Sequence, residues 1–278
     1  MKKVILLSTL FCMVTTLLFG CKAPAPVKQT DDVHNLTKGY EYRAETEYEY
    51  YVSSVNEKYT AVQGCCLVGN ELVIPINQPS AIAQEFTILH VVDVETGELL
   101  RTSDPLPLDH CNDLTYIEKE NVILAAHSHA PGGSNRHRYT KINPQTFEIV
   151  EVKDLPYSLF AMAYSSEKDM YASGRGDNTY DVWDGNLNPV FSREVEDAGA
   201  IRQGIYCDDK YIYVSCWQPN KILVYDWEYN FIRTIPIFFT DMPENIEPEG
   251  LFVKDGIMYV SCFLGGTAFV FRLSFFLQ

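Results

Sequence analysis

Short runs of alternating hydrophobic and polar residues, separated by turn residues, occupy most of the chain. Between residues 202 and 237, four such runs follow one another, and they are separated by the turn sequences Asp208-Asp209-Lys210, Gln218-Pro219-Asn220 and 226–230. A period of two with many β-branched and aromatic residues predicts strands rather than helices. Four antiparallel strands within about forty residues match the size of one β-propeller blade.

The same unit recurs along the chain at a nearly constant period. Its copies are spaced 49, 49, 42 and 46 residues apart and open at Gln63, Asn112, Ala161, Gln203 and Glu249. This period is typical of blade repeats. We therefore predict an all-β protein, a β-propeller of five four-stranded blades, as a single domain over residues 41–278.

The closure of the ring needs a strand from elsewhere in the sequence. The last copy reaches Gln278 with only three predicted strands, and a blade without its fourth strand leaves an unpaired edge. The aromatic run 48–52 lies just before the first copy and has a strand pattern. We predict that this N-terminal run pairs with the last copy and closes the ring.

The first residues have the order of an export signal. Lys2 and Lys3 precede an apolar run over 4–19, and Gly20 and Cys21 follow it. This order is typical of a secretory signal. The sequence Leu-Phe-Gly-Cys at its end resembles the lipobox of bacterial lipoproteins, which implies a signal peptide over 1–20 and a lipid on Cys21. We expect an exported, extracytoplasmic protein anchored to a bacterial membrane by that lipid. An ordinary secretory signal, with no lipid on Cys21, remains the alternative.

Residues 21–40 are polar, with Pro and Ala at their start, and show neither helical nor strand periodicity. Such a composition predicts a flexible tether between the lipid and the folded domain. The net charge of the whole chain is −15. Because nucleic acids and anionic lipid surfaces bind basic patches, this charge excludes them as predicted partners.

Six cysteines remain beyond the signal and Cys21, and three of them, Cys207, Cys216 and Cys262, occupy strand positions where other copies have Leu, Tyr, Ile, Ala or Gly. This pattern favours free, buried thiols, although an even number in an exported protein also permits disulfides. The chain has no Cys-x-x-Cys pair, and its spacing of cysteine and histidine does not predict a structural zinc site.

The inner strands of a propeller line a central channel, so the residues around their starts define the candidate ligand site. We predict that ligand-binding residues at this channel mouth are Gln63, His110, Asn112, Asp113, His127, His129, Arg175, Gln203, Trp217, Glu247 and Glu249. Gln63, Asn112 and Gln203 can equally have a structural role instead of binding a ligand, because such side chains often form hydrogen bonds with backbone groups of a neighbouring blade. The glycines after several openings, Gly64, Gly204 and Gly250, are expected to permit close approach near the axis.

Several motifs resemble known propeller families over residues 60–271. These motifs are Gln63-Gly64, His110-x-Asn112-Asp113-Leu114-Thr115-Tyr116, Gln203-Gly204-Ile205 and Glu247-Pro248-Glu249-Gly250-Leu251. They are similar to secreted propellers of the helveticin J-like type, which are bacteriocins or surface proteins. They also resemble NHL repeats and the gluconolactonase (senescence marker protein) type. The second resemblance implies a divalent metal, such as calcium, held by Glu249 and Asn112 for lactone hydrolysis. Asp113 is a further candidate ligand of this metal.

Two functional classes follow from these observations. The first is a binding module, without a cofactor, for a glycan, peptide or protein ligand at the channel mouth. The second is a divalent-metal-dependent hydrolase of the gluconolactonase-like type. The chain has no nucleophile-elbow or Ser-His-Asp motif, so we assign no catalytic residue and favour the binding module.

Overall fold

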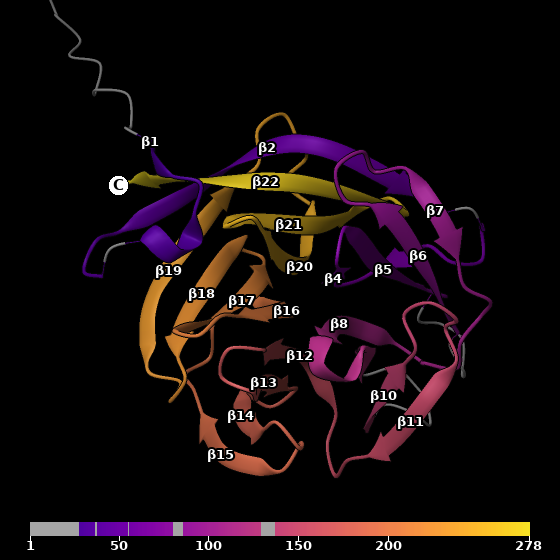
Figure 1. The fold of residues 1–278 in the computed structure, drawn as a ribbon. Coiled ribbons are helices and arrows are strands. Elements are labelled where there is room, and N and C mark those ends of the chain that lie inside the picture. The colour runs from indigo at the N-terminus through magenta and orange to yellow at the C-terminus, as the bar shows by residue number, and fades with distance from the viewer. Residues whose placement is uncertain (1–27, 37, 55, 80–85, 129–136) are drawn as a thin grey trace, which may run out of the picture.

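The computed structural model describes residues 28–36, 38–54, 56–79, 86–128 and 137–278. Residues 1–20, the predicted signal peptide, lie outside the described residues, as do Cys21 and His129. The described strands form mainly antiparallel sheets arranged around a common centre (Figure 1). This architecture is a β-propeller, as the sequence pattern predicts.

Each of the first four blades is a consecutive set of strands. The first contains β3 (Ala61–Val62), β4 (Cys66–Val68), β5 (Glu71–Asn77), β6 (Thr87–Asp93) and β7 (Leu99–Thr102). The second contains β8 (Cys111–Ile117), β9 (Val122–His127), β10 (Arg138–Ile142) and β11 (Ile149–Asp154). The third contains β12 (Leu159–Ser165), β13 (Met170–Arg175), β14 (Thr179–Asp184) and β15 (Pro189–Glu194). The fourth contains β16 (Ile201–Cys207), β17 (Tyr211–Trp217), β18 (Lys221–Asp226) and β19 (Phe231–Phe238).

The fifth blade joins the two ends of the chain. It contains β20 (Glu247–Lys254), β21 (Ile257–Leu264), β22 (Thr267–Leu277) and the N-terminal β2 (Tyr42–Ser53), which pairs antiparallel with β22. Tyr48 lies opposite Phe271, with their ring centroids 6.0 Å apart. The predicted closure by the tyrosine-rich run is thus confirmed. A short parallel pairing of β2 with β19 also joins the fourth and fifth blades.

Part of the predicted tether is folded onto the propeller. β1 (Lys28–Thr30) pairs with β22, and a short 3-10 helix, η1 (Val33–Asn35), follows it. Val33 is only 2% exposed and packs between the fourth and fifth blades. The prediction of a flexible tether is therefore wrong for residues 28–36. Val33 and the partly buried Leu36 anchor this segment together with the β1–β22 pairing, and two apolar residues in a polar stretch produce no clear periodicity.

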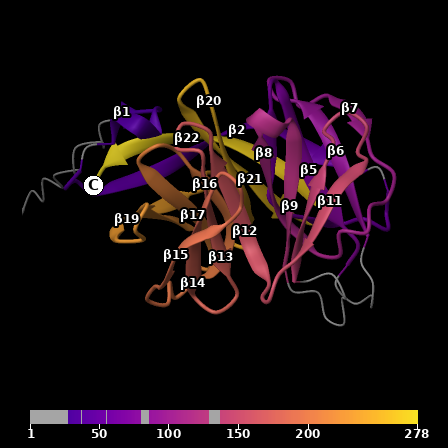
Figure 2. The same ribbon diagram turned by 60° about the horizontal axis from the view of Figure 1, so that its bottom comes forward.

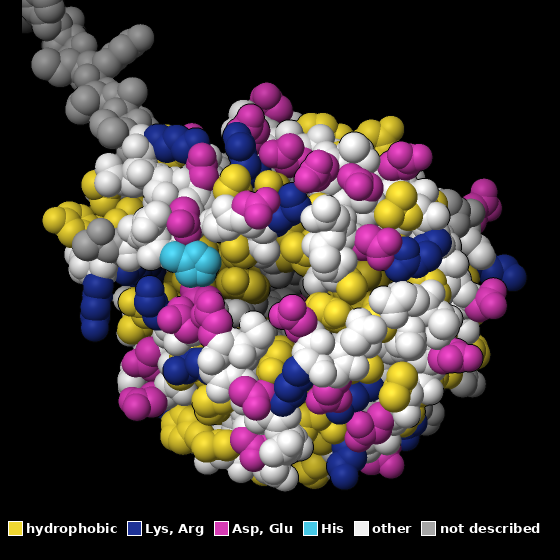
Figure 3. All heavy atoms as spheres, in the orientation of Figure 1, with side chains coloured by type: hydrophobic (Ala, Val, Ile, Leu, Met, Phe, Trp, Pro, Cys, Tyr) yellow, Lys and Arg dark blue, Asp and Glu magenta, His cyan; other side chains and the backbone are white. Residues whose placement is uncertain are grey.

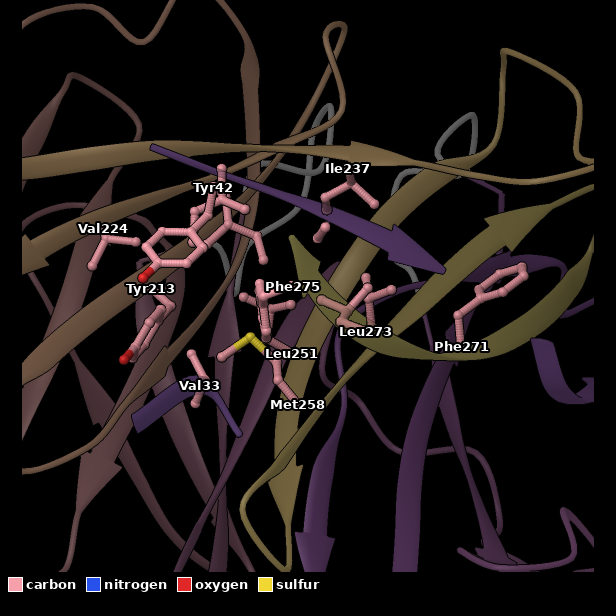
Figure 4. Packing of buried hydrophobic residues seen from close by; sticks show 14 of the residues in the cluster. Val33, Tyr42, Tyr213, Val224, Ile237, Leu251, Met258, Phe271, Leu273 and Phe275 are labelled. Carbon is pink, nitrogen blue, oxygen red and sulfur yellow. The ribbon is translucent and has the colours of Figure 1, made fainter. Parts of the chain in front are cut away.

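The hydrophobic core lies between neighbouring blades, where the faces of their sheets meet. Figure 4 shows one such cluster, in which Tyr213 and Val224 of the fourth blade face Leu251 and Phe275 of the fifth. Burying a side chain of this size contributes about 1.5–3 kcal/mol, so each interface stabilises both of its blades. None of the sheets can bury its two faces alone. The blades therefore form one domain.

Six cysteines belong to the described residues, and all are free and buried: Cys65, Cys66, Cys111, Cys207, Cys216 and Cys262. This agrees with the interpretation of these residues as small packing side chains. Among the described residues, no helix is long and apolar enough to cross a membrane.

Candidate functional site

The strands β4, β8, β12, β16 and β20 surround the axis, and each contacts the next, with β20 returning to β4. Each inner edge has an irregular register near its start. β8 is irregular at Asn112, β12 at Phe160 and β20 at Glu249, while residues 63–65 separate β3 from β4. Because such bulges redirect side chains, they bring the polar residues of different blades together at the axis.

Asn112 on β8 connects its own strand to β12, to β16 and to the segment that leads into β4. Its Nδ2 donates hydrogen bonds to the carbonyl oxygens of Phe160 at 2.7 Å and Gln203 at 3.0 Å. Its own carbonyl oxygen accepts a bond from the backbone N–H of Gly64 at 3.0 Å. These are the backbone contacts that the structural alternative predicted for this residue. The side-chain amide of Asn112 is therefore already used in holding the ring together.

Asp113 reaches across the axis. The backbone N–H of Ile205 on β16 donates to its Oδ2 at 3.1 Å, and the N–H of Leu114 donates to Oδ1 at 3.0 Å. β12 lies between β8 and β16 around the ring, so this contact spans the centre rather than a neighbouring edge. Burial raises the pKa of Asp113 well above its usual value, although the backbone N–H groups oppose that shift. Together with Asn112, this side chain closes the axis at this level.

Glu249 is the most unusual side chain at the axis. It is 0% exposed, and neither of its carboxyl oxygens has a hydrogen-bond partner among the described residues. Burial raises its pKa well above the usual value, and the charges of Glu247 and Asp113 add to that shift. A buried carboxyl between two others is costly to ionise, so we expect it to hold its proton at neutral pH.

Glu247 lies beside Glu249 at the start of β20. Gln203 donates a hydrogen bond from Nε2 to Oε1 of Glu247, which links β16 to β20. Burial raises the pKa of Glu247, while the bond from Gln203 and the charge of His110 oppose the shift. His110, Asn112, Asp113, Gln203, Glu247 and Glu249 are therefore connected around the axis, and this group is called the axial polar cluster below.

Two glycines explain how the inner strands come so close. A Cβ at Gly204 would lie 2.4 Å from the carbonyl oxygen of Glu249, and one at Gly250 would lie 2.7 Å from the backbone nitrogen of Cys65. No real side chain tolerates such distances to backbone atoms. The expected role of these glycines in close approach is confirmed by this geometry.

Other predicted residues make contacts within their own sheets. His127 is fully buried, with Nε2 3.0 Å from the hydroxyl of Thr140 on β10. Arg175 donates from Nε to Asp181 on β14 at 2.7 Å, and its guanidinium lies 3.6 Å from the ring centre of Tyr157. These two side chains therefore turn toward third strands and not toward the axial polar cluster. The physical reason is that both end a second strand and have a polar partner on the strand next to it.

Gln63 and Trp217 lie at the same end of their sheets as the axial polar cluster. Gln63 is buried and donates from Nε2 to the carbonyl oxygen of Val62 at 2.9 Å, while its Oε1 has no partner among the described residues. Trp217 ends β17 opposite Ile201, and its indole N–H has no partner among the described residues either.

The metal set implied by family resemblance is only partly assembled. Asn112 and Asp113 are engaged by backbone groups, and Glu249 lies near Asp113. Among the described residues, no group of three or more His, Cys, Asp or Glu side chains is arranged to hold a metal ion.

An axial pocket of about 330 Å³ opens at the other end of the inner strands. Every inner strand contributes to it, because it is lined by residues 65–67, 114–116, 205–207 and 251–253, together with Ala163, Tyr164, Ser166 and Glu118. Figure 1 views this face, where the 3-10 helix η2 (Glu118–Glu120) follows β8, and Figure 3 shows the hollow near its middle.

The pocket residues were not among the predicted ligand-binding residues. They come directly after the polar openings, at the same offset in each repeat, and that regularity is the signal that could have identified them. The pocket lies at the carboxyl ends of the inner strands, whereas the predicted mouth lies at their amino ends. Figure 2, which turns the molecule by 60°, shows the two ends of the inner strands as opposite faces.

No protein-family model matches the chain, and no curated protein matches its sequence. Among solved structures, glutaminyl cyclase from Myxococcus xanthus is similar, with a TM-score of 0.59 and 10% identity; the match covers 86% of this chain and 99% of that one. The tail fiber of Staphylococcus aureus phage P68 has a TM-score of 0.58 and 13% identity, covering 86% of this chain and 53% of the fiber. BamB from Moraxella catarrhalis is more distant, with a TM-score of 0.37 at 13% identity over 75% of this chain and 57% of BamB.

Sequence identities this low support a shared fold and do not support a shared activity. The first two neighbours match most of this chain, and the blade topology described above agrees with the match. The chain is therefore a β-propeller protein.

Proposed function

We propose that the protein is a lipid-anchored, extracytoplasmic binding module whose ligand occupies the axis of the propeller. The observation that carries this proposal is the axial pocket, to which all inner strands contribute and which has about 330 Å³ of space. This volume is within the range of about 300–1,000 Å³ that is typical of small-ligand sites. A glycan end, a peptide end or a loop of another protein would fit the description.

The rigid surroundings of the pocket support a binding role. Asn112 and Asp113 join β8 to β12 and β16 directly beneath the pocket residues Leu114 and Ile205. A site whose walls are already fixed loses little conformational freedom when the ligand binds. The lipid on Cys21 and the exported location rest on the signal sequence and belong to the same proposal.

A divalent-metal hydrolase is the second candidate, and Glu249 is the observation that favours it. Its two unpartnered, buried oxygens are a donor set that a hard cation would use. Asn112 and Asp113 oppose this candidate because their side chains already bind backbone groups. The binding module is therefore the better supported of the two.

The test is a thermal-shift screen of the mature protein with saccharides, peptides and divalent ions. The peptides include one with an N-terminal glutamine, because one structural neighbour is named a glutaminyl cyclase. Ser166 is exposed and lines the axial pocket, so Ser166→Phe adds a large side chain at the pocket, and the exposure of this position spares the core. Its neighbour Glu167 is exposed and outside the lining, which makes Glu167→Phe the matched control.

A ligand of the axial pocket raises the Tm of the wild type and of Glu167→Phe but not of Ser166→Phe. If every ligand that stabilises the wild type also stabilises Ser166→Phe equally, binding at the axial pocket is wrong. Stabilisation by calcium, magnesium or zinc that Glu249→Gln abolishes would instead support the hydrolase.

A further inference from the structure

The axial pocket presents backbone groups to its occupant. Each inner strand pairs with a second strand on one side only, so the N–H and C=O groups of its other edge face the axis. Three of these groups already have side-chain partners: the N–H of Tyr164 donates to Oγ1 of Thr115 at 3.1 Å, and the N–H groups of Leu114 and Ile205 donate to Asp113 at the closed end of the axis. The other edge groups of the lining strands are those that an occupant can reach. Buried backbone groups need partners, and an occupant that both donates and accepts hydrogen bonds suits alternating N–H and C=O groups.

Aromatic rings from four inner strands also line the pocket: Tyr116, Tyr164, Tyr206 and Phe252. Three of these rings are held in place by contacts with residues outside the pocket lining. The hydroxyl of Tyr116 donates to Asn121 at 2.8 Å and that of Tyr164 donates to Asp169 at 2.8 Å, while Phe252 stacks on Tyr259 at 4.9 Å. Fixed aromatic rings offer apolar area to a flat ligand at little entropic cost.

The lining is nearly neutral. Among the described residues that form it, none is Lys or Arg, and Glu118 is the one carboxylate, exposed at the rim. The three thiols are buried, and burial raises the pKa of Cys65 to about 12 and the pKa values of Cys66 and Cys207 well above the usual range. A charged ligand would lose its hydration here without gaining an opposite charge.

From these three properties we infer that the axial pocket binds a neutral saccharide unit. This inference rests on the proposed axial binding function and names its ligand class. The C–H faces of a sugar ring pack against the aromatic rings, and its hydroxyls donate to and accept from the strand edges. The volume of the pocket is near the lower end for ligand sites, so it takes the end of a glycan rather than a longer segment.

The experiment is saturation-transfer NMR followed by calorimetry on the mature protein. The panel contains neutral oligosaccharides built from glucose, mannose, xylose and N-acetylglucosamine. The comparison ligands are a uronic-acid disaccharide and a lysine-containing tripeptide. Four variants are compared with the wild type: Ser166→Phe, Glu167→Phe, Tyr116→Leu and Tyr116→Phe. Circular dichroism and Tm confirm that each variant is folded.

We expect at least one neutral saccharide to bind, with a Kd that rises about tenfold or more in Ser166→Phe and Tyr116→Leu. The Kd should stay within about twofold of the wild type in Glu167→Phe and Tyr116→Phe, and it should not change when salt is raised from about 50 to about 500 mM.

Two results would overturn the inference in distinguishable ways. If a charged comparison ligand binds and Ser166→Phe abolishes that binding, while no neutral saccharide binds, the ligand class is wrong and the axial function stands. If saccharides or other ligands bind equally well to Ser166→Phe, or nothing binds at all, both the ligand class and the proposed axial site are wrong.

Discussion

Replacing Asn112 with alanine tests whether the ring is held together across its centre. The side chain is 5% exposed, and its amide donates to two carbonyl oxygens, of Phe160 and Gln203, on two other inner strands. Asn112→Ala leaves both carbonyl groups buried without this donor. Each unsatisfied group costs about 1–3 kcal/mol, so we expect a loss of about 2–6 kcal/mol in the free energy of unfolding.

The assay is urea unfolding followed by circular dichroism and tryptophan fluorescence at pH 7. Asn186 is exposed at a turn of the third blade, and Asn186→Ala should change the free energy of unfolding by less than about 0.5 kcal/mol. Asn112→Asp provides a second arm, because a carboxylate has no N–H to donate and would lie near Asp113. We expect it to destabilise at least as much as the alanine variant at neutral pH.

A loss below about 1 kcal/mol in Asn112→Ala would refute the reasoning, because the two hydrogen bonds could not then support the ring. Stabilisation of Asn112→Asp by calcium would also contradict it. That result would mean that position 112 serves a metal and not the backbone.

Three further predictions concern the axis and the anchor. The pKa of Glu249 is raised in the folded state, so the native protein binds more protons than the unfolded chain above the unfolded pKa of about 4.3. The free energy of unfolding of the wild type should therefore fall as the pH rises above the unfolded pKa of Glu249. Glu249→Gln removes this titration, so its stability relative to the wild type should increase between pH 5 and pH 8 in urea titrations. An equal dependence of the free energy of unfolding on pH in both proteins would contradict this. Gly204→Ala should lower the free energy of unfolding by more than about 3 kcal/mol, because its Cβ meets the backbone oxygen of Glu249. Gly176→Ala should change it by less than about 1 kcal/mol, because a Cβ there would lie 3.9 Å from Oγ of Ser158. Cys21→Ser should abolish incorporation of labelled fatty acid in bacterial cells, and retained labelling would rule out a lipid at that residue.

The architecture could be predicted because its signals are local. Each strand shows its alternation within a few residues, and each copy of the unit repeats the same order of strands and turns. The role of the run 48–52 also followed from counting, since the last copy lacked one strand and this run had the pattern to supply it. Its pairing with β22 is as predicted, although β2 is longer, Tyr42–Ser53.

The candidate site was predicted less completely. The polar openings of the repeats do meet at the axis, and Asn112, Asp113, Gln203 and Glu249 all belong to the axial polar cluster. His127 and Arg175 follow second strands at the same end, but their partners Thr140 and Asp181 lie on third strands. Position in the repeat places a residue at one end of a blade. It does not say which neighbour its side chain will contact.

The order of strands, the closure of the ring and the need for glycine near its centre were determined by the sequence alone, because each depends on patterns within one repeat or on a count of repeats. Only the tertiary structure decided that the axis is closed by Asn112 and Asp113 and that the pocket opens at the opposite end from the predicted mouth. The backbone partner of Asp113 on β16 is 92 residues away in the chain. Contacts at such separations exist only once the blades have packed into a ring, because the packing sets which strand edges meet across the centre.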